Sequence, residues 1–585
     1  MPGIHGVYLM NNTPKKYKNV SNIFRKSLRS LSHYPSYRNE IICENSKFML
    51  GSSGPAGYPI RVLNSKKLIT LCEGEIYSHK MEDLPSIARD MMINNHLSQK
   101  LDGDFLLLNY DIEQKVLRIM NDYFGRLPFY YALSNDLFIF SREIKFIMPF
   151  LKEVEIDRDA IAEYLLLRYP LGDRTLIKGI QRFKASSSLV VDNKGMDLKT
   201  NVHNLDPDNN MKYLSNNYVS SCVNAFIDST RDRISKYSKS KHIVLLSGGL
   251  DSRALLSSLV QAGIKPLTIT FLLKSAPVHA MLERITASLL SYLYGLHNIT
   301  FKVDRSRIIK DHSRIVHLKD GLAPTYRLKN LDEIILHKTN EYGINVVSIG
   351  SGGDKTLAPS GYTKEFSNIN FTVRQIISQG QIFTEEEIRK LCIDSNNPLP
   401  RIQHIVERFP EATLEGKFRH FMLYQRALKK IFEYEDFARF HYPHYTPFYS
   451  PRFFSLTMKA PESLKENYYF YKRFFAMLDR KLILVPYANL LMPIGAPTKI
   501  LKFLMKIRQI SLNLISRRKR KEYGLFELKN QLHNSINECH RKYFNIDYMI
   551  QLIKNIKNEM RAYTLLAILT YINIIESKKT NFKNK

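Results

Sequence analysis

Six consecutive residues that begin at Ser247 (Ser-Gly-Gly-Leu-Asp-Ser) combine the residue types that a phosphate-binding loop needs. Gly248 and Gly249 let the backbone turn tightly and approach a ligand without a Cβ in the way. Backbone N–H groups at the start of a following helix would point at an anion. Ser247 and Ser252 add hydroxyl donors, and Asp251 offers a carboxylate that suits Mg²⁺. The loop therefore predicts a site for phosphate groups and a divalent cation.

The alternative for this loop is an ordinary Gly-Gly turn in which Asp251 caps the next helix. Six such residues between a strand and a helix are less common than a Gly-Gly pair alone, which favours the binding site. The loop is not a P-loop, because Gly-Lys-Ser/Thr is absent. The Gly-x-Gly-x-x-Gly spacing of a dinucleotide site is absent as well.

A second glycine-rich loop follows another apolar run further along the chain. It contains Gly350, Ser351, Gly352, Gly353 and Asp354. A flexible turn is the simpler interpretation of such a composition. Its position directly after a predicted strand favours a functional loop instead.

Strands and helices alternate around both loops. Short apolar runs with β-branched residues predict strands, and apolar residues at helical spacing predict the helices between them. This alternation is typical of a mainly parallel α/β sheet, in which ligands bind at the carboxyl ends of the strands. The predicted strands are 242–246, 267–273, 299–303 and 345–349, and the predicted helices are 281–293 and one that has Leu255, Leu256, Leu259 and Val260 on one face.

The N-terminal part of the chain has a different pattern and is β-rich. Apolar runs at 105–108 and 116–120 flank a polar stretch, as in a β-hairpin. The run at 137–140 predicts a further strand. This part of the chain therefore belongs to a separate domain.

Polar, turn-rich segments at 192–195 and 204–210 mark the best domain boundary in the sequence. From about Tyr487 onward the sequence predicts basic helices and no strand. The predicted domains are residues 1–200, 211–480 and 481–585.

The composition is that of a globular protein, with 44% hydrophobic and 24% charged residues. The length exceeds one ordinary core and predicts two or three domains. No apolar run reaches the ~18 to 20 residues needed to span a bilayer, and the first residues show no signal-peptide pattern. The five cysteines are scattered, which argues against a disulfide framework and a zinc knuckle and favours a reducing cytoplasm.

The formal net charge of +31 has two interpretations. A concentrated charge would indicate contact with nucleic acid or an anionic membrane, whereas a dispersed charge makes a solvated surface. Most basic residues are dispersed, so we do not expect nucleic acid to be a partner. The exception is the basic cluster at 517–521, which is a candidate for contact with an acidic surface. With the apolar and basic residues before it, an anionic membrane contact through 500–521 is one interpretation. An ordinary surface helix that packs its apolar face inward is the more common one.

The Ser-Gly-Gly-x-Asp-Ser motif resembles that of the PP-loop ATP pyrophosphatases, and the order of the two loops resembles the asparagine synthetase family. That family includes the β-lactam synthetases and the lasso-peptide cyclases. The resemblance implies an N-terminal Ntn-hydrolase-like α+β sandwich, then a doubly wound, mainly parallel α/β PP-loop domain, with a helical C-terminal extension. It also implies the chemistry: a substrate carboxylate attacks the α-phosphate of ATP, pyrophosphate leaves, and an amine displaces AMP to give an amide.

The resemblance implies a set of nucleotide-binding residues. Asp251 and Asp354 would share Mg²⁺ between the phosphates of ATP, across which the two loops face each other. The other implied residues are Leu246, Ser247, Gly248, Gly249, Leu250, Ser252, Leu272, Ile349, Gly350 and Gly352.

Two positions depart from the family pattern. Ser351 stands where the family loop has a catalytic Glu, or a Tyr in β-lactam synthetases, and a serine of ordinary pKa is a poor general base. The segment 446–456 resembles the family's Val-Pro-Phe-Leu-Asp segment, and the catalytic lysine expected after it falls on Tyr469. Lys472, on the same predicted helix, or Lys355 would then stabilise charge on the leaving phosphates. A solvated surface lysine is the alternative for each.

The start of the chain resembles the family's glutaminase domain, in which a Cys directly after Met1 becomes the nucleophile. Pro2 stands in that place and has no thiolate to offer. Glu73 stands where the family has an Asn of the oxyanion hole, and its charge would repel an oxyanion. We therefore expect the fold to be kept and the glutaminase chemistry to be lost. Other landmarks that match are at 73–79, 102–105 and 122–131.

The sequence predicts an ATP-dependent amide-forming ligase that adenylates a small-molecule or peptide carboxylate and accepts ammonia or an amine. Four substitutions favour an alternative, a relative that binds ATP without turnover: Ser351, Tyr469, Pro2 and Glu73. A glutamine-hydrolysing asparagine synthase and a basic surface-binding protein are further alternatives. A homodimer is also left open.

Overall fold

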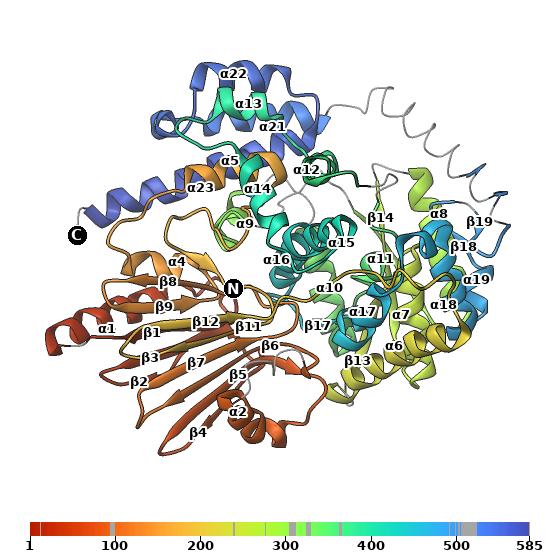
Figure 1. Ribbon diagram of the computed structural model, residues 1–585, viewed down its shortest axis with the longest axis horizontal. Helices are drawn as coiled ribbons and strands as arrows, with labels where there is room; N and C mark the ends of the chain where they lie inside the picture. Colours follow the sequence, from red (N-terminus) through yellow and green to blue (C-terminus); the bar gives the residue numbers. More distant parts are fainter. Residues whose placement is uncertain are drawn as a thin grey trace.

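Antiparallel strands form the first part of the computed structural model, and a parallel sheet with helices on both faces follows (Figure 1). The N-terminal part holds two six-stranded sheets whose inner faces share one core, with Leu50, Leu108 and Phe140 fully buried in it. The structure describes residues 1–11, 13–93, 100–237, 240–274, 277–303, 312–322, 329–361, 366–490, 492–497, 499–500, 503–504 and 523–583.

Both N-terminal sheets are antiparallel throughout their assigned ladders. The first sheet has the order β10 (Gln181–Arg182), β8 (Tyr130–Ser134), β9 (Leu137–Ser141), β1 (Gly3–Leu9), β3 (Phe48–Pro55) and β2 (Tyr37–Glu44). The second has the order β12 (Met196–Thr200), β11 (Ser187–Val191), β7 (Val116–Asn121), β6 (Gly103–Asp111), β5 (Leu68–Ile76) and β4 (Ile60–Asn64). The predicted hairpin is confirmed as β6 and β7.

Helices cover the outer faces of this sandwich. Because successive side chains of a strand point to opposite faces, each strand feeds both the inner core and an outer one. Helix α1 (Pro14–Arg29) packs Val20 and Phe24 onto the first sheet, and α2 (Leu84–Ile93) packs Leu84 onto the second. The predicted α+β sandwich is therefore confirmed.

The parallel sheet of the second domain has the order β15-β14-β13-β16-β17. Every ladder in it is parallel. The chain begins in the middle, moves to one edge and returns to the other side, so the strand order reverses between β13 and β16. Ligands of open α/β sheets bind at such a switch point. The strands are β13 (Lys241–Leu245), β14 (Leu267–Leu273), β15 (Asn298–Val303), β16 (Ile344–Ser348) and β17 (His444–Tyr445).

The four predicted strands of this sheet are confirmed to within one or two residues. The two predicted helices are confirmed as α7 (Leu250–Gln261) and α8 (Pro277–Leu293), of which α8 begins four residues before the predicted start. The sequence did not reveal β17, because two residues carry no periodicity. The same holds for a two-stranded ladder of β18 (Pro486–Tyr487) and β19 (Met492–Pro493). The expectation that no strand follows Tyr487 was therefore wrong.

One half of the predicted domain boundary lies inside a sheet. Residues 192–195 form the turn of the β11–β12 hairpin, where Asp192 N donates to Gly195 O at 3.0 Å. The other segment, 204–210, lies between β12 and α6 (Asn216–Lys236), as expected of a connection. The domain limits themselves stay predictions.

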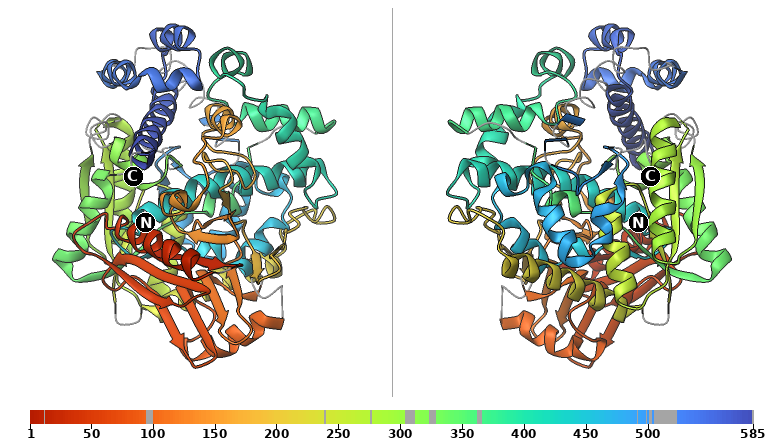
Figure 2. Two further views of the ribbon diagram at one scale, coloured as in Figure 1. Left: turned by 90° about the vertical axis from the view of Figure 1, so that its left-hand side faces the viewer. Right: turned by 90° about the vertical axis from the view of Figure 1, so that its right-hand side faces the viewer.

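The C-terminal helices pack against the N-terminal part of the chain (Figures 1 and 2). Helix α23 (Glu559–Lys583) has fully buried residues on several sides and shares a core with α5 (Arg158–Leu167). With α23 lie α21 (Tyr523–Ser535) and α22 (Ile546–Asn555). Among the described residues, no helix is both long and apolar enough to cross a membrane.

The predicted membrane-contacting segment 500–521 lies largely outside the described residues. Phe503, one of its few described members, is 63% exposed. The basic cluster 517–521 is not among the described residues.

Helix α16 (Leu428–Ala438) joins the two domains through buried ion pairs. Its carboxylates are at most 2% exposed, and each accepts from an N-terminal-domain side chain. A buried carboxylate costs several kcal/mol of desolvation unless a cation and further donors compensate it, so such pairs fix one docking geometry. The contacts are Glu433 with Arg182 (2.8 Å) and Tyr130 (2.7 Å), Glu435 with Arg126 (2.6 Å), and Asp436 with Arg142.

Removing one member of this cluster should destabilise the protein strongly. Asp436 also accepts from Lys319 at 2.9 Å, so Asp436→Leu takes one carboxylate partner from each of two buried cations. Breaking a buried pair in this way costs about 3–5 kcal/mol of unfolding free energy. Urea denaturation followed by circular dichroism measures it.

The matched control is Lys178→Met, which removes an exposed pair with Glu155, whose side chain is 52% exposed. That change should leave the urea midpoint almost unchanged, because exposed pairs contribute little. Equal effects of the two substitutions would contradict the assigned role of α16.

Candidate functional site

The first predicted loop connects β13 to α7 at the switch point of the parallel sheet. The two loop serines brace it: Ser247 N donates to Ser252 Oγ at 3.2 Å, and the two hydroxyls lie 3.1 Å apart. Gly249, the N-cap residue of α7, donates its N–H to Ser247 Oγ at 3.1 Å. These hydrogen bonds within the loop use the N–H groups of Ser247 and Gly249, and none of them uses an N–H of the first turn of α7.

The second predicted loop follows β16 and packs directly on the first. A Cβ on Gly350 would lie 2.7 Å from Ser252 N, and one on Gly353 would lie 2.5 Å from Asp251 Cγ. A larger residue would require the backbone to move at Gly350 and the Asp251 side chain to move at Gly353. Gly352 has a φ of 103°, a left-handed conformation that glycine adopts without strain. The loop glycines therefore permit close contact of the loops.

Two carboxylates meet where the loops touch. Asp354 N donates to Asp251 Oδ2 at 3.0 Å, and Tyr471 OH donates to Asp251 Oδ1 at 2.5 Å. Burial, and then the nearby Asp354, raise the pKa of Asp251. A raised pKa of this origin means that a cation between the two side chains would stabilise both.

The described residues contain no cluster of three or more His, Cys, Asp or Glu side chains that could hold a metal alone. Asp251 and Asp354 fit a Mg²⁺ ion only if ligand oxygens complete its shell, because Mg²⁺ takes six oxygen ligands and commonly binds through one or two carboxylates plus phosphates. The donor set therefore suits a metal that arrives with a phosphate ligand.

A cavity of about 300 Å³ opens above the two loops. Seven of the predicted residues line it, together with Leu245, Ala358 and three tyrosines. The predicted lining residues are Ser247, Gly249, Leu250, Asp251, Ser252, Gly350 and Asp354, and the tyrosines are Tyr468, Tyr471 and Tyr487.

The other predicted nucleotide-binding residues lie around this cavity rather than in its wall. Leu246 and Leu272 are buried at the ends of β13 and β14, and Ile349 is partly buried after β16. Gly248 packs against Ala488, and Gly352 packs against Tyr449. Their assignment to adenosine or to the phosphates stays a prediction.

The predicted catalytic side chains are dispersed. Lys355 Nζ lies 2.5 Å from Asp354 Oδ2, but Lys355 itself is not among the residues that line the cavity. Lys472 Nζ donates to Ala496 O at 3.4 Å, and Tyr469 is half-buried in an apolar cluster. Neither Lys472 nor Tyr469 is among the residues that line the cavity.

Sequence reasoning missed the residues that hold the loops from outside. Tyr471 binds Asp251 from α18 (Tyr469–Leu478), and no motif links the two residues. Arg253 directly follows the loop motif, so its position was visible, but its buried partners were not. Long-range contacts of this kind leave no local signal in one sequence.

Comparison with known proteins gives two adjacent matches. A family described as asparagine synthase matches residues 224–457, which include both loops. A family described as glutamine amidotransferase domain matches residues 89–202, within the sandwich. The two matches together cover more than half of the chain. The chain belongs to the asparagine synthetase family.

Individual relatives are distant. "Asparagine synthetase [glutamine-hydrolyzing] 1" of Bacillus subtilis (strain 168) is 29% identical over 94 residues, which are 16% of this chain and 15% of that protein. Two solved structures are 9% identical with a TM-score of 0.23: one described as the allosteric regulatory enzyme of purine biosynthesis, the other as the glutamine PRPP amidotransferase from B. subtilis complexed with ADP and GMP. They cover 51% and 52% of this chain, and 80% and 81% of their own chains are covered. Likenesses this weak carry no argument.

By the family resemblance, Glu73 stands where a glutaminase would have the Asn of its oxyanion hole. It is fully buried in β5 beside the start of β1, where its oxygens accept from Ile4 N at 3.0 Å and Tyr58 OH at 2.8 Å. Arg142 Nη1 lies 3.3 Å from the same carboxylate. Two hydrogen-bond donors and one cation at this place are therefore already bound to Glu73.

No thiolate is available beside this position in the described chain. Pro2 is buried, and the nearest cysteine in sequence, Cys72, faces the core under α2. Burial raises the pKa of Cys72 to about 12, so it remains a thiol at neutral pH. The geometry agrees with the expected loss of glutaminase chemistry, which stays a proposal.

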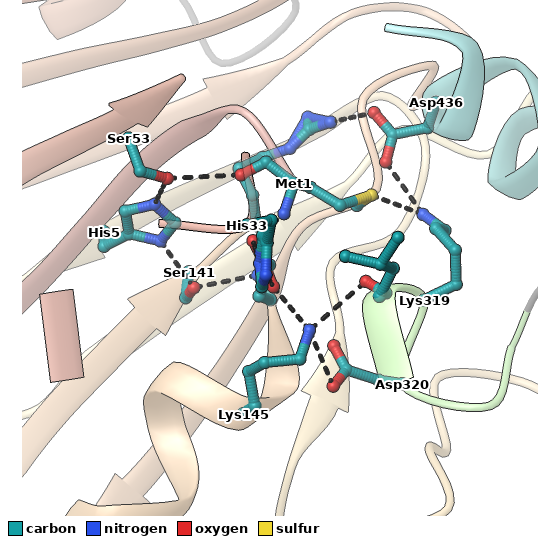
Figure 3. Close-up of polar contacts among 12 residues, drawn as sticks. Met1, His5, His33, Ser53, Ser141, Lys145, Lys319, Asp320 and Asp436 are labelled. Atoms are coloured by element: carbon teal, nitrogen blue, oxygen red, sulfur yellow. Dashed lines mark hydrogen bonds and ion pairs between the residues drawn. The ribbon is translucent and has the colours of Figure 1, made fainter. Parts of the chain in front are cut away.

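His5 lies in a closed chain of hydrogen bonds beside the same site (Figure 3). Ser53 Oγ donates to Met1 O at 3.2 Å, so His5 Nε2 must be the donor to Ser53 at 2.8 Å. His5 Nδ1 then accepts from Ser141 Oγ at 2.7 Å, and Ser141 Oγ in turn accepts from Glu143 N. Every member has one defined direction, which fixes the neutral Nε2–H tautomer. Burial lowers the pKa of His5 well below its ordinary value.

Stability should fall as the pH drops below about 6.5, the ordinary pKa of histidine. Buried His5 and His444 have lowered pKa values, so the unfolded chain binds protons there that the folded chain does not. Each such proton lowers the unfolding free energy by about 1.4 kcal/mol per pH unit between the two pKa values. The contribution is complete above pH 6.5 and is lost on acidification. Urea denaturation from pH 7.5 to 5 measures it.

His5→Gln should reduce this slope by about one proton, whatever its effect at pH 7.5. The control, His404→Gln, changes an exposed histidine on α14 (Pro398–Glu407) and should leave the slope unchanged. An unchanged slope in His5→Gln would show that His5 is protonated in the folded protein.

Proposed function

We propose that this protein is an ATP-dependent ligase that adenylates a substrate carboxylate and transfers the acyl group to an amine or to ammonia. The observation that carries the proposal is the contact of two glycine-rich loops at the switch point, with Asp251 and Asp354 facing each other. Membership of the asparagine synthetase family makes ATP-dependent carbon–nitrogen ligation the reaction class to test.

The chemistry of the cavity wall suits ATP with Mg²⁺. The cavity lies at the N-terminus of α7, where free N–H groups and the helix dipole favour the binding of phosphate. Asp251 and Asp354 would hold Mg²⁺ together with phosphate oxygens, and the metal would neutralise the charge on the phosphates. Lys355, beside Asp354, lies closer to this position than Lys472 does and is the stronger candidate to stabilise the leaving pyrophosphate.

The reaction would proceed in two balanced steps. A carboxylate oxygen attacks the α-phosphorus, the bond from that phosphorus to the β-phosphate bridging oxygen breaks, and pyrophosphate leaves. The amine nitrogen then attacks the acyl carbon, the bond to the AMP oxygen breaks, and the nitrogen loses a proton. Solvent would accept this proton, because the two carboxylates of the described cavity wall, Asp251 and Asp354, would be bound to Mg²⁺.

A non-catalytic ATP-binding relative is the second candidate. It is favoured by the distance of Lys472 and Tyr469 from the cavity wall and by the position of Ser351. The Ser351 carbonyl accepts from Thr446 Oγ1 at 2.8 Å, which makes this residue a support for the loop. Both candidates bind ATP, and only the ligase turns it over.

Carboxylate-dependent exchange of labelled pyrophosphate into ATP should occur with small-molecule or peptide carboxylates. Asp251→Asn should lower the exchange at least about 100-fold, because it removes one of the two charges that would bind the metal. Loss of one such electrostatic contact in an active site costs about 3–4 kcal/mol of transition-state stabilisation. Asp228→Asn, an exposed change on α6, is the control and should retain full exchange. Binding of ATP by the wild type without exchange for any acid tested would favour the non-catalytic relative.

The purified protein should release no ammonia from glutamine, because Pro2 offers no thiolate and Glu73 fills the oxyanion position. The measurement is glutamate formation, with Pro2→Ala as the control. Glutamate formation by the wild type above that control would overturn the loss of glutaminase activity. Free ammonia or hydroxylamine, in contrast, should be able to serve as the acceptor.

A further inference from the structure

Arg253 is fully buried in the first turn of α7, directly after the nucleotide loop. All five of its N–H donors find main-chain carbonyl oxygens. Its acceptors are Gly249 (3.0 Å), Gly248 (3.2 Å), Leu482 (3.2 Å), Val485 (3.0 Å) and Pro486 (3.0 Å).

These acceptors belong to two segments that are far apart in the sequence. Two lie in the nucleotide loop, and three lie in residues 482–488, which we call the strap. Burial lowers the pKa of Arg253 to about 10, and all five of its hydrogen bonds go to main-chain carbonyls rather than to a carboxylate. Carbonyl dipoles alone therefore hold a buried cation, and they do so only while the loop and the strap converge on it.

The guanidinium also controls which way the loop faces. In a trans peptide the C=O and the following N–H point in opposite directions. Since the Gly249 carbonyl is turned toward Arg253, the N–H of Leu250 is turned toward the cavity, which Leu250 lines. A carbonyl oxygen turned the other way would repel a phosphate group.

The strap returns from Arg253 to the same cavity. Ala488 N donates to Gly248 O at 3.3 Å, and a Cβ on Gly248 would lie only 2.3 Å from that of Ala488. Tyr487, one residue earlier, lines the cavity, and its ring lies 5.6 Å from that of Tyr468. One end of the strap thus forms cavity wall, and the other end is held by Arg253.

We propose that Arg253 is a positioning residue that couples the nucleotide loop to the strap, so that phosphate binding and placement of Tyr487 occur together. The inference rests on the proposed function in one respect, that ATP binds at this loop. Arg253 does not touch the nucleotide; it acts through the carbonyls of Gly248 and Gly249. Arginine suits this role because its planar fork reaches both segments at once, whereas the three donors of a lysine spring from a single atom.

The test compares Arg253→Lys with wild type and with Arg284→Lys, an exposed control on α8. Calorimetric titration with the Mg²⁺ complex of a non-hydrolysable ATP analogue gives the affinity at a temperature where all three proteins are folded. We expect Arg253→Lys to bind at least 10-fold more weakly and Arg284→Lys to bind as the wild type does. Hydrogen exchange with and without the analogue should show nucleotide-dependent protection of 482–488 in the wild type and its loss in Arg253→Lys.

A second variant keeps the test decisive if Arg253→Lys does not fold. Ala488→Leu leaves Arg253 intact and wedges the strap away from Gly248, so it should weaken analogue binding to a similar extent. A purely structural role predicts a lower melting temperature with unchanged affinity and unchanged protection, which would overturn the proposal. Absence of analogue binding by the wild type would instead refute the proposed function, and the coupling with it.

Discussion

The close contact of the two nucleotide loops, which brings Asp251 and Asp354 to one place, imposes the main constraint on this molecule. Glycines at the contact let the loops approach so closely, and the Tyr471 hydroxyl and the Asp354 N–H both donate to the Asp251 carboxylate. Burial, and then the nearby Asp354, raise the pKa of Asp251. Such an arrangement suits a ligand that brings positive charge to the Asp251 carboxylate. The sheet order, the loop glycines and α18 all serve to hold this pair.

Buried charge is treated differently at the domain interface. There, Glu433, Glu435 and Asp436 each lie at hydrogen-bond distance from a cation or a hydroxyl of the sandwich. The contrast separates the two sites physically. At the interface each carboxylate of α16 has a cation of the protein as its partner, whereas Asp251 lies in the wall of a cavity.

The sequence predicted the parallel sheet, both loops and their carboxylates, because each follows from local residue types: glycine pairs, apolar strands and the acids between them. It could not predict Tyr471, Arg253 or the strap, whose contacts join positions more than two hundred residues apart. The same reason explains why Lys472 was expected at the cavity but does not line it. Its position on the helix was visible in the sequence, whereas the direction of its side chain depends on the contact with Ala496, which only the folded chain defines. The hairpin turn at 192–195 was misplaced as a linker because turns inside sheets and between domains use the same residues.

The N-terminal sandwich also has a structural role, whatever chemistry it carries. Asp436 provides one physical answer, since it is fully buried and its cations come from both domains: Arg142 from the sandwich and Lys319 from the synthetase part. Removal of the sandwich would leave the carboxylates of α16 without Arg126 and Arg142 and would expose the core that they border. Helix α16 leads directly into β17, which pairs with β16, and β16 ends at the second loop. The sandwich therefore supports, through α16 and β17, the strand that ends at the loop of Asp354.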